Sequence, residues 1–164
     1  METATNLDFY LRPSEVVAKE LLNGKIIRKL PDKEIIGTIL ETGAYEGGKI
    51  TDKRRGMLYS GGTIFLMPYR GLTSLNIATD KKNLASCVEI RAAEFNGEIL
   101  ETPYRLAKFL SLNYYDPIKN IDGELLGDKF RIEPLEKKLE DSQITINKPV
   151  GMSDNCFAYY NVKK

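Results

Sequence analysis

Short extended runs joined by turns dominate this chain of 164 residues, and they constrain its fold more than any other feature. Runs of apolar and alternating residues bounded by Gly, Pro, Asn or Asp are typical of β-strands. The expected strands are residues 25–30, 34–42, 63–69, 72–78, 85–94, 129–133, 143–147 and 156–162. Because hairpin-length links join many of these runs, the sequence predicts an α+β fold with a largely antiparallel sheet.

Two short helices are expected beside the sheet. Pro13-Ser14 begins the first, Leu21 and Leu22 belong to its apolar stripe, and Asn23-Gly24 ends it. Residues 103–112 predict the second helix. No internal repeat, low-complexity tract or linker interrupts the pattern, so we expect residues 1–164 to form a single compact domain.

Ionisable residues recur at intervals of two in two of the expected strands. Strict alternation would place on one face of the second strand Ile35, Gly37, Ile39, Glu41, Gly43 and Tyr45. It would place on one face of the fifth strand Cys87, Glu89, Arg91 and Ala93. A carboxylate and a tyrosine flanking a glycine could receive a planar group. A solvated strand end and a surface Glu–Arg pair explain the same patterns, and these alternatives stay open.

The composition excludes several kinds of chemistry. The chain has no histidine, which removes Ser-His and Cys-His nucleophiles and His-containing zinc sites. Its two cysteines, Cys87 and Cys156, are too few for a Cys₄ zinc site, and buried apolar thiols are expected, with a disulfide as the alternative. Catalysis is therefore left to carboxylates, Tyr, Lys, Arg and the backbone.

Positive charge is concentrated in one segment. The formal net charge is only +1, yet a cluster within seven residues contains Lys49, Lys53, Arg54 and Arg55. The cluster falls in an expected irregular loop over residues 46–62, and loops of that length are uncommon unless they are functional. A nucleic-acid binder usually carries a basic surplus, so any such surface must be local here. A solvated loop is the alternative.

Targeting signals are not expected. The first ten residues, METATNLDFY, contain no basic stretch leading into an apolar segment, so no signal peptide is predicted. Apolar runs fall far short of the ~20 residues that a membrane helix needs, so no membrane partner is expected. A cytoplasmic location is the resulting expectation.

Residues 39–47, Ile-Leu-Glu-Thr-Gly-Ala-Tyr-Glu-Gly, resemble the I-V-E-T-E-A-Y-x-G motif of the alkyladenine (3-methyladenine) DNA glycosylase family. Further segments match motifs of that family in order, at residues 17–25, 55–63, 75–77, 87–94, 102–107 and 150–152. The resemblance implies a compact α+β domain with a curved antiparallel sheet. It also implies an enzyme that flips alkylated purines out of double-stranded DNA and hydrolyses the N-glycosidic bond. No metal or cofactor, a monomer and a nucleoid location in a prokaryote are implied as well.

The resemblance carries several site residues over. Tyr45 occupies the position of the tyrosine that stacks on the flipped base, and Asn76 that of the asparagine at the purine edge. Arg91 matches the arginine beside the attacking water. The aromatic wedge that fills the vacated stack falls on Tyr69, with Arg70 as the alternative.

Other positions depart from the family pattern. Gly43 stands where the family has its general-base glutamate, and a second pocket tyrosine is Met67 or absent. The usual pocket histidine falls near Arg54, which with Lys53 and Arg55 is expected to contact phosphates.

Two interpretations follow. In the first, the enzyme is active and Glu41 serves as the base, because it lies about 6.5–7 Å from position 43 at Cα on the same strand face. In the second, catalysis is lost and the chain is a binding module for damaged DNA or other nucleic acid. A protein-interaction domain on the same fold is a third possibility.

Overall fold

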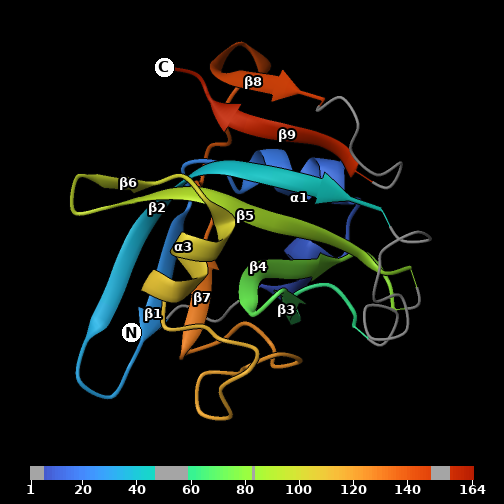
Figure 1. The fold of residues 1–164 in the computed structure, drawn as a ribbon. Coiled ribbons are helices and arrows are strands. Elements are labelled where there is room, and N and C mark those ends of the chain that lie inside the picture. Colours follow the sequence, from blue (N-terminus) through green and yellow to red (C-terminus); the bar gives the residue numbers. More distant parts are fainter. Residues whose placement is uncertain (1–5, 47–58, 83, 149–155) are drawn as a thin grey trace.

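The computed structural model describes residues 6–46, 59–82, 84–148 and 156–164 (Figure 1). Within these ranges the chain forms a curled antiparallel sheet and two short α-helices, which confirms the α+β prediction. The helical segments are η1 (Leu7–Tyr10), α1 (Ser14–Glu20), α3 (Pro103–Phe109) and η2 (Asp141–Gln143). The strands are β1 (Lys25–Lys29), β2 (Glu34–Tyr45), β3 (Ile64–Tyr69), β4 (Leu72–Thr79), β5 (Ser86–Phe95), β6 (Glu98–Leu100), β7 (Phe130–Glu133), β8 (Ile144–Asn147) and β9 (Cys156–Val162).

The expected strands and helices are confirmed, with ends that differ by a few residues. The three-residue strand β6 escaped prediction, because a run so short has no period of its own. Of the expected loop over residues 46–62, only residues 46 and 59–62 are described. None of the helices in the described ranges is long and apolar enough to cross a membrane.

Strand β2 organises the sheet. Its first five residues pair with β1, and its last five pair with β9. Strand β5 pairs with it from Thr38 to Tyr45 along the opposite edge. Since β1 and β9 share one edge of β2, the sheet divides there and curls. Figure 1 shows β9, β2, β5 and β4 following one another across the sheet.

A bulge in the middle of β2 changes which face its side chains occupy. The register with β5 shifts on both sides of Glu41. Ile39 is therefore fully buried in the main hydrophobic cluster, whereas Tyr45 packs against a second, small cluster. The prediction that residues 35–45 present one continuous face is wrong, because the irregular pairing around Glu41 interrupts the strict alternation of side chains in both strands. Glu41, Gly43 and Tyr45 still share a face.

The same shift affects β5. Ala93, which pairs with Ile39, is buried in the main cluster, so the prediction that it shares a face with Glu89 and Arg91 is also wrong. Cys87 belongs to the second cluster and stays on the face of Glu89 and Arg91. At this irregularity the odd-numbered residues of both strands therefore change from the face of the main core to the face that carries Glu41, Glu89 and Arg91.

The main cluster fills the other face of the sheet and includes both α-helices. Val17 of α1, Leu21 directly after α1 and Leu106 of α3 are fully buried there. The hydroxyl of Thr42 on β2 donates to the carbonyl oxygen of Ala18 at 2.8 Å, which fixes α1 against that strand. Tyr45 and the ionisable residues are therefore left on the face that the main core does not use.

Candidate functional site

A row of residues crosses four neighbouring strands on the face away from the main core. Gly43 of β2 pairs with Tyr159 of β9 on one side and with Glu89 of β5 on the other. Glu89 pairs in turn with Asn76 of β4. Residues directly opposite each other in an antiparallel sheet present their side chains to the same face. The pairing therefore gathers an aromatic ring, a glycine, a carboxylate and an amide.

Arg91 ties this row together. Its Nε donates to Oε1 of Glu41 at 3.0 Å, and its Nη1 donates to Oε1 of Glu89 at 2.5 Å. Its guanidinium carbon lies 3.7 Å from the centre of the Tyr159 ring, which is a cation–π contact. About a fifth or less of each of the three charged side chains is exposed, so water screens these interactions only partly.

Burial and neighbouring charges shift the pKa of both partners of the central ion pair, Glu89 and Arg91. Burial raises the pKa of Glu89, although the charge and hydrogen bond of Arg91 act in the opposite direction. Burial would lower the pKa of Arg91, but the charge of Glu89 and the other neighbours outweigh it, and the net effect is a raised pKa. The site therefore holds a permanent cation beside a carboxylate that is easier to protonate than an exposed one.

Tyr45 lies at the centre of the predicted base-binding residues. Its hydroxyl is 3.4 Å from both Oε1 of Glu89 and the hydroxyl of Tyr159. Its ring packs with Met67 against the small cluster of buried residues that contains Cys87. Tyr45 and Met67 therefore share contacts with one small apolar cluster.

Asn76 is buried beside the same cluster. Its Oδ1 accepts from Sγ of Cys87 at 3.8 Å, and its Nδ2 donates to Oγ of Ser74 at 3.2 Å. Only 3% of the residue is exposed. Its amide is therefore held in one orientation by neighbours on β4 and β5, next to Glu89 in the pairing.

Tyr69 and Arg70 lie at the tip of the β3–β4 hairpin. Arg70 and Gly71 form its two-residue turn with φ values of 50° and 81°, and Tyr69 pairs with Leu72 across it. Positive φ at both central residues is the type I′ geometry that suits hairpins. Tyr69 is 53% exposed, and the Arg70 guanidinium lies 5.3 Å from its ring centre. The two candidates for the wedge thus project together at an exposed tip.

Three further residues belong to this site, and their membership was not predicted from the sequence. Glu89 was expected only as one member of an ionisable pair. Its spacing of two residues from Arg91 was the sequence feature that could have identified it as a site residue. Tyr159 is placed over Gly43 and Arg91 by the pairing of β9, which no local pattern gives. Tyr104, at the start of α3, stacks on Tyr69 with ring centres 6.3 Å apart. Burial and then the charge of Glu89 raise the pKa of Tyr104.

The basic residues Lys53, Arg54 and Arg55 lie outside the described residues. Their predicted contacts with phosphate therefore stay predictions.

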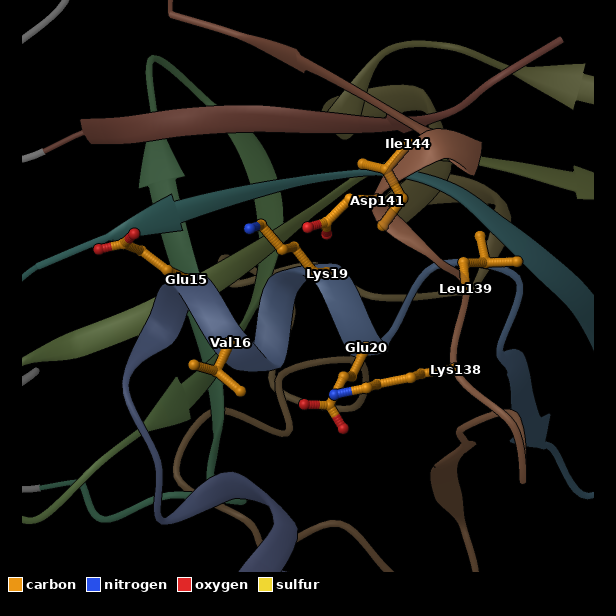
Figure 2. Close-up of a pocket in the computed structure, with 8 residues that line it drawn as sticks. All are labelled: Glu15, Val16, Lys19, Glu20, Lys138, Leu139, Asp141 and Ile144. Carbon is orange, nitrogen blue, oxygen red and sulfur yellow. The ribbon is translucent and has the colours of Figure 1, made fainter.

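A surface pocket of about 260 Å³ lies elsewhere, between α1 and the segment that leads into β8 (Figure 2). Its lining includes the lysines Lys19 and Lys138 and three carboxylates, those of Glu15, Glu20 and Asp141. None of the site residues named above lines it. Its charges nearly cancel, so it offers no surplus positive charge to a phosphate, and we assign it no role.

Comparison with known proteins identifies the family. The family model for methylpurine-DNA glycosylase matches residues 8–108, more than half of the chain. A relative from Borreliella burgdorferi is 32% identical over 123 residues, which cover 64% of this chain and 66% of the relative. One from Synechococcus elongatus is 29% identical over 160 residues, covering 86% and 80%. Both carry the name "Putative 3-methyladenine DNA glycosylase". The chain spans just under two thirds of the Borreliella relative. It belongs to the methylpurine-DNA glycosylase family.

Proposed function

We propose that this protein is a 3-methyladenine DNA glycosylase, which flips an alkylated purine out of double-stranded DNA and hydrolyses its N-glycosidic bond. The observation that carries the proposal is the Arg91 cluster beside Tyr45, on the sheet face that the main core leaves unused. The family match and the names of the relatives support DNA as the substrate. The protein acts as a monomer on DNA of the cytoplasm or nucleoid.

Base recognition falls to three residues in this proposal. The ring of Tyr45 stacks on the flipped base, and an alkylated purine that carries a positive charge adds a cation–π attraction. Asn76, with its amide fixed by Cys87 and Ser74, discriminates at the purine edge. Met67 packs beside Tyr45 and closes the side of the base site.

Arg91 is the catalytic residue in this proposal, and Glu41 is its ion-pair partner. Glu41 holds Nε of Arg91, which keeps the guanidinium aimed across the strand toward Gly43 and Glu89. A carboxylate that accepts a proton from water accelerates such a hydrolysis by about 10²–10⁴-fold. The family position for that carboxylate is Gly43 here, so the proton acceptor comes from a neighbouring residue.

Contacts with DNA come from the hairpin tip and the basic segment. Tyr69 fills the space that the flipped nucleotide leaves, and Arg70 lies beside it for the phosphate backbone. Lys53, Arg54 and Arg55 supply further phosphate contacts. Because the net charge is only +1, nonspecific binding is weak and depends on these few residues.

The decisive experiment measures base release. Duplex DNA treated with a methylating agent is incubated with the protein, and free 3-methyladenine is quantified in single-turnover conditions. Release above the uncatalysed rate is the expected result. Tight binding to the lesion with no release would instead support the module that binds damaged DNA, an alternative favoured by the glycine at position 43. If the protein neither binds the lesion nor releases the base, both the glycosylase function and the function as a binding module are contradicted.

Replacing Tyr45 with alanine tests the stacking role. Stacking of one base on an aromatic ring contributes about 1–3 kcal/mol, so affinity for a lesion duplex should fall by roughly 5- to 150-fold. Tyr45→Phe is the matched control, because it keeps the ring and removes only the hydroxyl contacts with Glu89 and Tyr159. Equal lesion affinity of Tyr45→Ala and the wild type, measured by fluorescence anisotropy, would rule out the stacking role.

A further inference from the structure

Glu89 is the carboxylate closest in the sheet to the position where the family has its glutamate. It pairs directly with Gly43 across the β2–β5 ladder. Directly opposite residues in an antiparallel pair have Cα atoms about 4.5–5.5 Å apart. Glu41 is two residues along the strand, at about 6.5–7 Å. A side chain on β5 can therefore reach the region in front of Gly43 more directly than Glu41 can.

The space at Gly43 is already occupied by other side chains. A Cβ atom added there would lie 3.0 and 3.1 Å from two carbons of the Tyr159 ring and 3.2 Å from Cδ of Arg91. The ring is held by the guanidinium against its face and by the hydroxyl of Tyr45. A carboxylate cannot enter from position 43 unless this packing moves, whereas Glu89 enters from the neighbouring strand without disturbing it.

The immediate surroundings of Glu89 suit a proton acceptor. Nη1 of Arg91 and the hydroxyl of Tyr45 both donate to Oε1. These are the hydrogen bonds to its carboxylate among the described residues, which leaves Oε2 for a further donor such as water. Glu89 also contacts Tyr45, which is proposed to stack on the base. It pairs with Asn76, which is proposed at the purine edge.

We propose that Glu89 is the general base of this glycosylase and that Glu41 is a positioning residue that holds Arg91. This inference rests on the proposed function. In the step, a water oxygen bonds to C1′ of the flipped nucleotide while the C1′–N bond breaks. The electron pair of that bond goes to the departing purine, and the proton of the water goes to Oε2 of Glu89. A cationic alkylpurine thus leaves as a neutral base, and the carboxylate becomes a carboxylic acid.

A pH dependence follows from this assignment. Burial raises the pKa of Glu89 above the usual value of about 4.3 for glutamate. The base must be ionised to accept a proton, so the rate should rise with pH through the raised pKa and then level off. A base with a pKa closer to neutrality also accepts protons more readily, which favours Glu89 over a fully exposed carboxylate.

The test compares Glu89→Gln with Glu41→Gln on methylated duplex DNA in single-turnover conditions. Glu89→Gln should lower the rate of 3-methyladenine release by about 10²–10⁴-fold and remove the rise of rate with pH. Glu41→Gln should lower the rate by only about tenfold and keep that rise, because it loosens Arg91 and leaves the base in place. Glu98→Gln, at an exposed residue of β6, is the control and should match the wild type.

The outcomes separate this proposal from the proposed function. If the wild type releases the base and Glu89→Gln releases it equally fast, the role of Glu89 is overturned and the glycosylase function stands. The same holds if only Glu41→Gln loses release. No release by the wild type would overturn both. If Glu89→Gln fails to fold by circular dichroism, the pH–rate profile of the wild type decides. A rate that stays level in Glu41→Gln and the wild type as pH falls to the usual glutamate pKa of about 4.3 would then exclude a base with a raised pKa.

Discussion

Replacing Arg91 with methionine is expected to lower the free energy of unfolding by about 3 kcal/mol near neutral pH. The substitution supplies a long side chain without charge, and it leaves the carboxylate of Glu89, whose side chain is only 13% exposed, without its cation. Glu41 loses its partner as well, and the cation–π contact with Tyr159 disappears. Base release should also fall to the background rate. Urea unfolding followed by circular dichroism measures the first effect.

The loss of folding stability in Arg91→Met should be larger at high pH than at low pH. Without Arg91, the pKa of Glu89 in the folded state rises further above its unfolded value of about 4.3. A folded pKa that is raised favours the folded protein at low pH, and this contribution is lost as pH rises through the folded pKa. The stability difference from the wild type should therefore be smaller at pH 5 than at pH 8.

The double variant Arg91→Met/Glu89→Gln is the control for this explanation. It removes the unpaired carboxylate, so it should be more stable than Arg91→Met alone at pH 8, and its deficit should be nearly the same at both pH values. An equal deficit of Arg91→Met at pH 5 and pH 8 would mean that lost packing, rather than an unpaired charge, explains the effect.

Replacing Gly61 with alanine is expected to destabilise the protein by about 3 kcal/mol or more, or to prevent folding. A Cβ atom there would lie 2.2 Å from the carbonyl oxygen of Tyr10 and 2.6 Å from its carbonyl carbon. These are backbone atoms, and the amide of Asp80 fixes the same carbonyl oxygen with a hydrogen bond of 2.8 Å. Neither side of the contact can therefore move cheaply.

Gly127→Ala is the matched control for Gly61→Ala. The nearest atom to an added Cβ at position 127 is 3.9 Å away, which is an ordinary contact. Its midpoint of unfolding in urea should shift by no more than the equivalent of about 0.5 kcal/mol. A similar shift for both variants would show that the contact with Tyr10 adds no cost to the general effect of replacing glycine with alanine.

The strands of this protein other than β6 were predictable because each carries its own local pattern. The run that became β4, residues 72–78 by prediction, ends one residue later at Thr79. The tip of the β3–β4 hairpin also follows from sequence, since Arg70-Gly71 supplies the glycine that a type I′ turn favours. The bulge at Glu41 was not predictable, because it is defined by the register of β2 against β5 and not by either sequence alone.

Some residues of the candidate site could also be predicted from the sequence, and others could not. The resemblance of residues 39–47 pointed to Tyr45 and to the missing glutamate at Gly43, and the interval of two pointed to an ion pair of Glu89 with Arg91. Local patterns could not place Tyr159 over Gly43, because these residues lie far apart in the chain and meet only when β9 pairs with β2. Nor could they show that Arg91 also holds Glu41.

The sequence by itself determined the α+β class, the order of strands along the chain and the family motifs that direct attention to one face of β2. Those features depend on neighbours within a few residues, through alternation, turn chemistry and motif spacing. Only the tertiary structure decided which carboxylate pairs with Gly43 across the sheet. Cross-strand pairing put Glu89 on one side of Gly43 and Tyr159 on the other, and burial then raised the pKa of Glu89. Pairing partners and burial are properties of the assembled sheet, so no single segment could specify them.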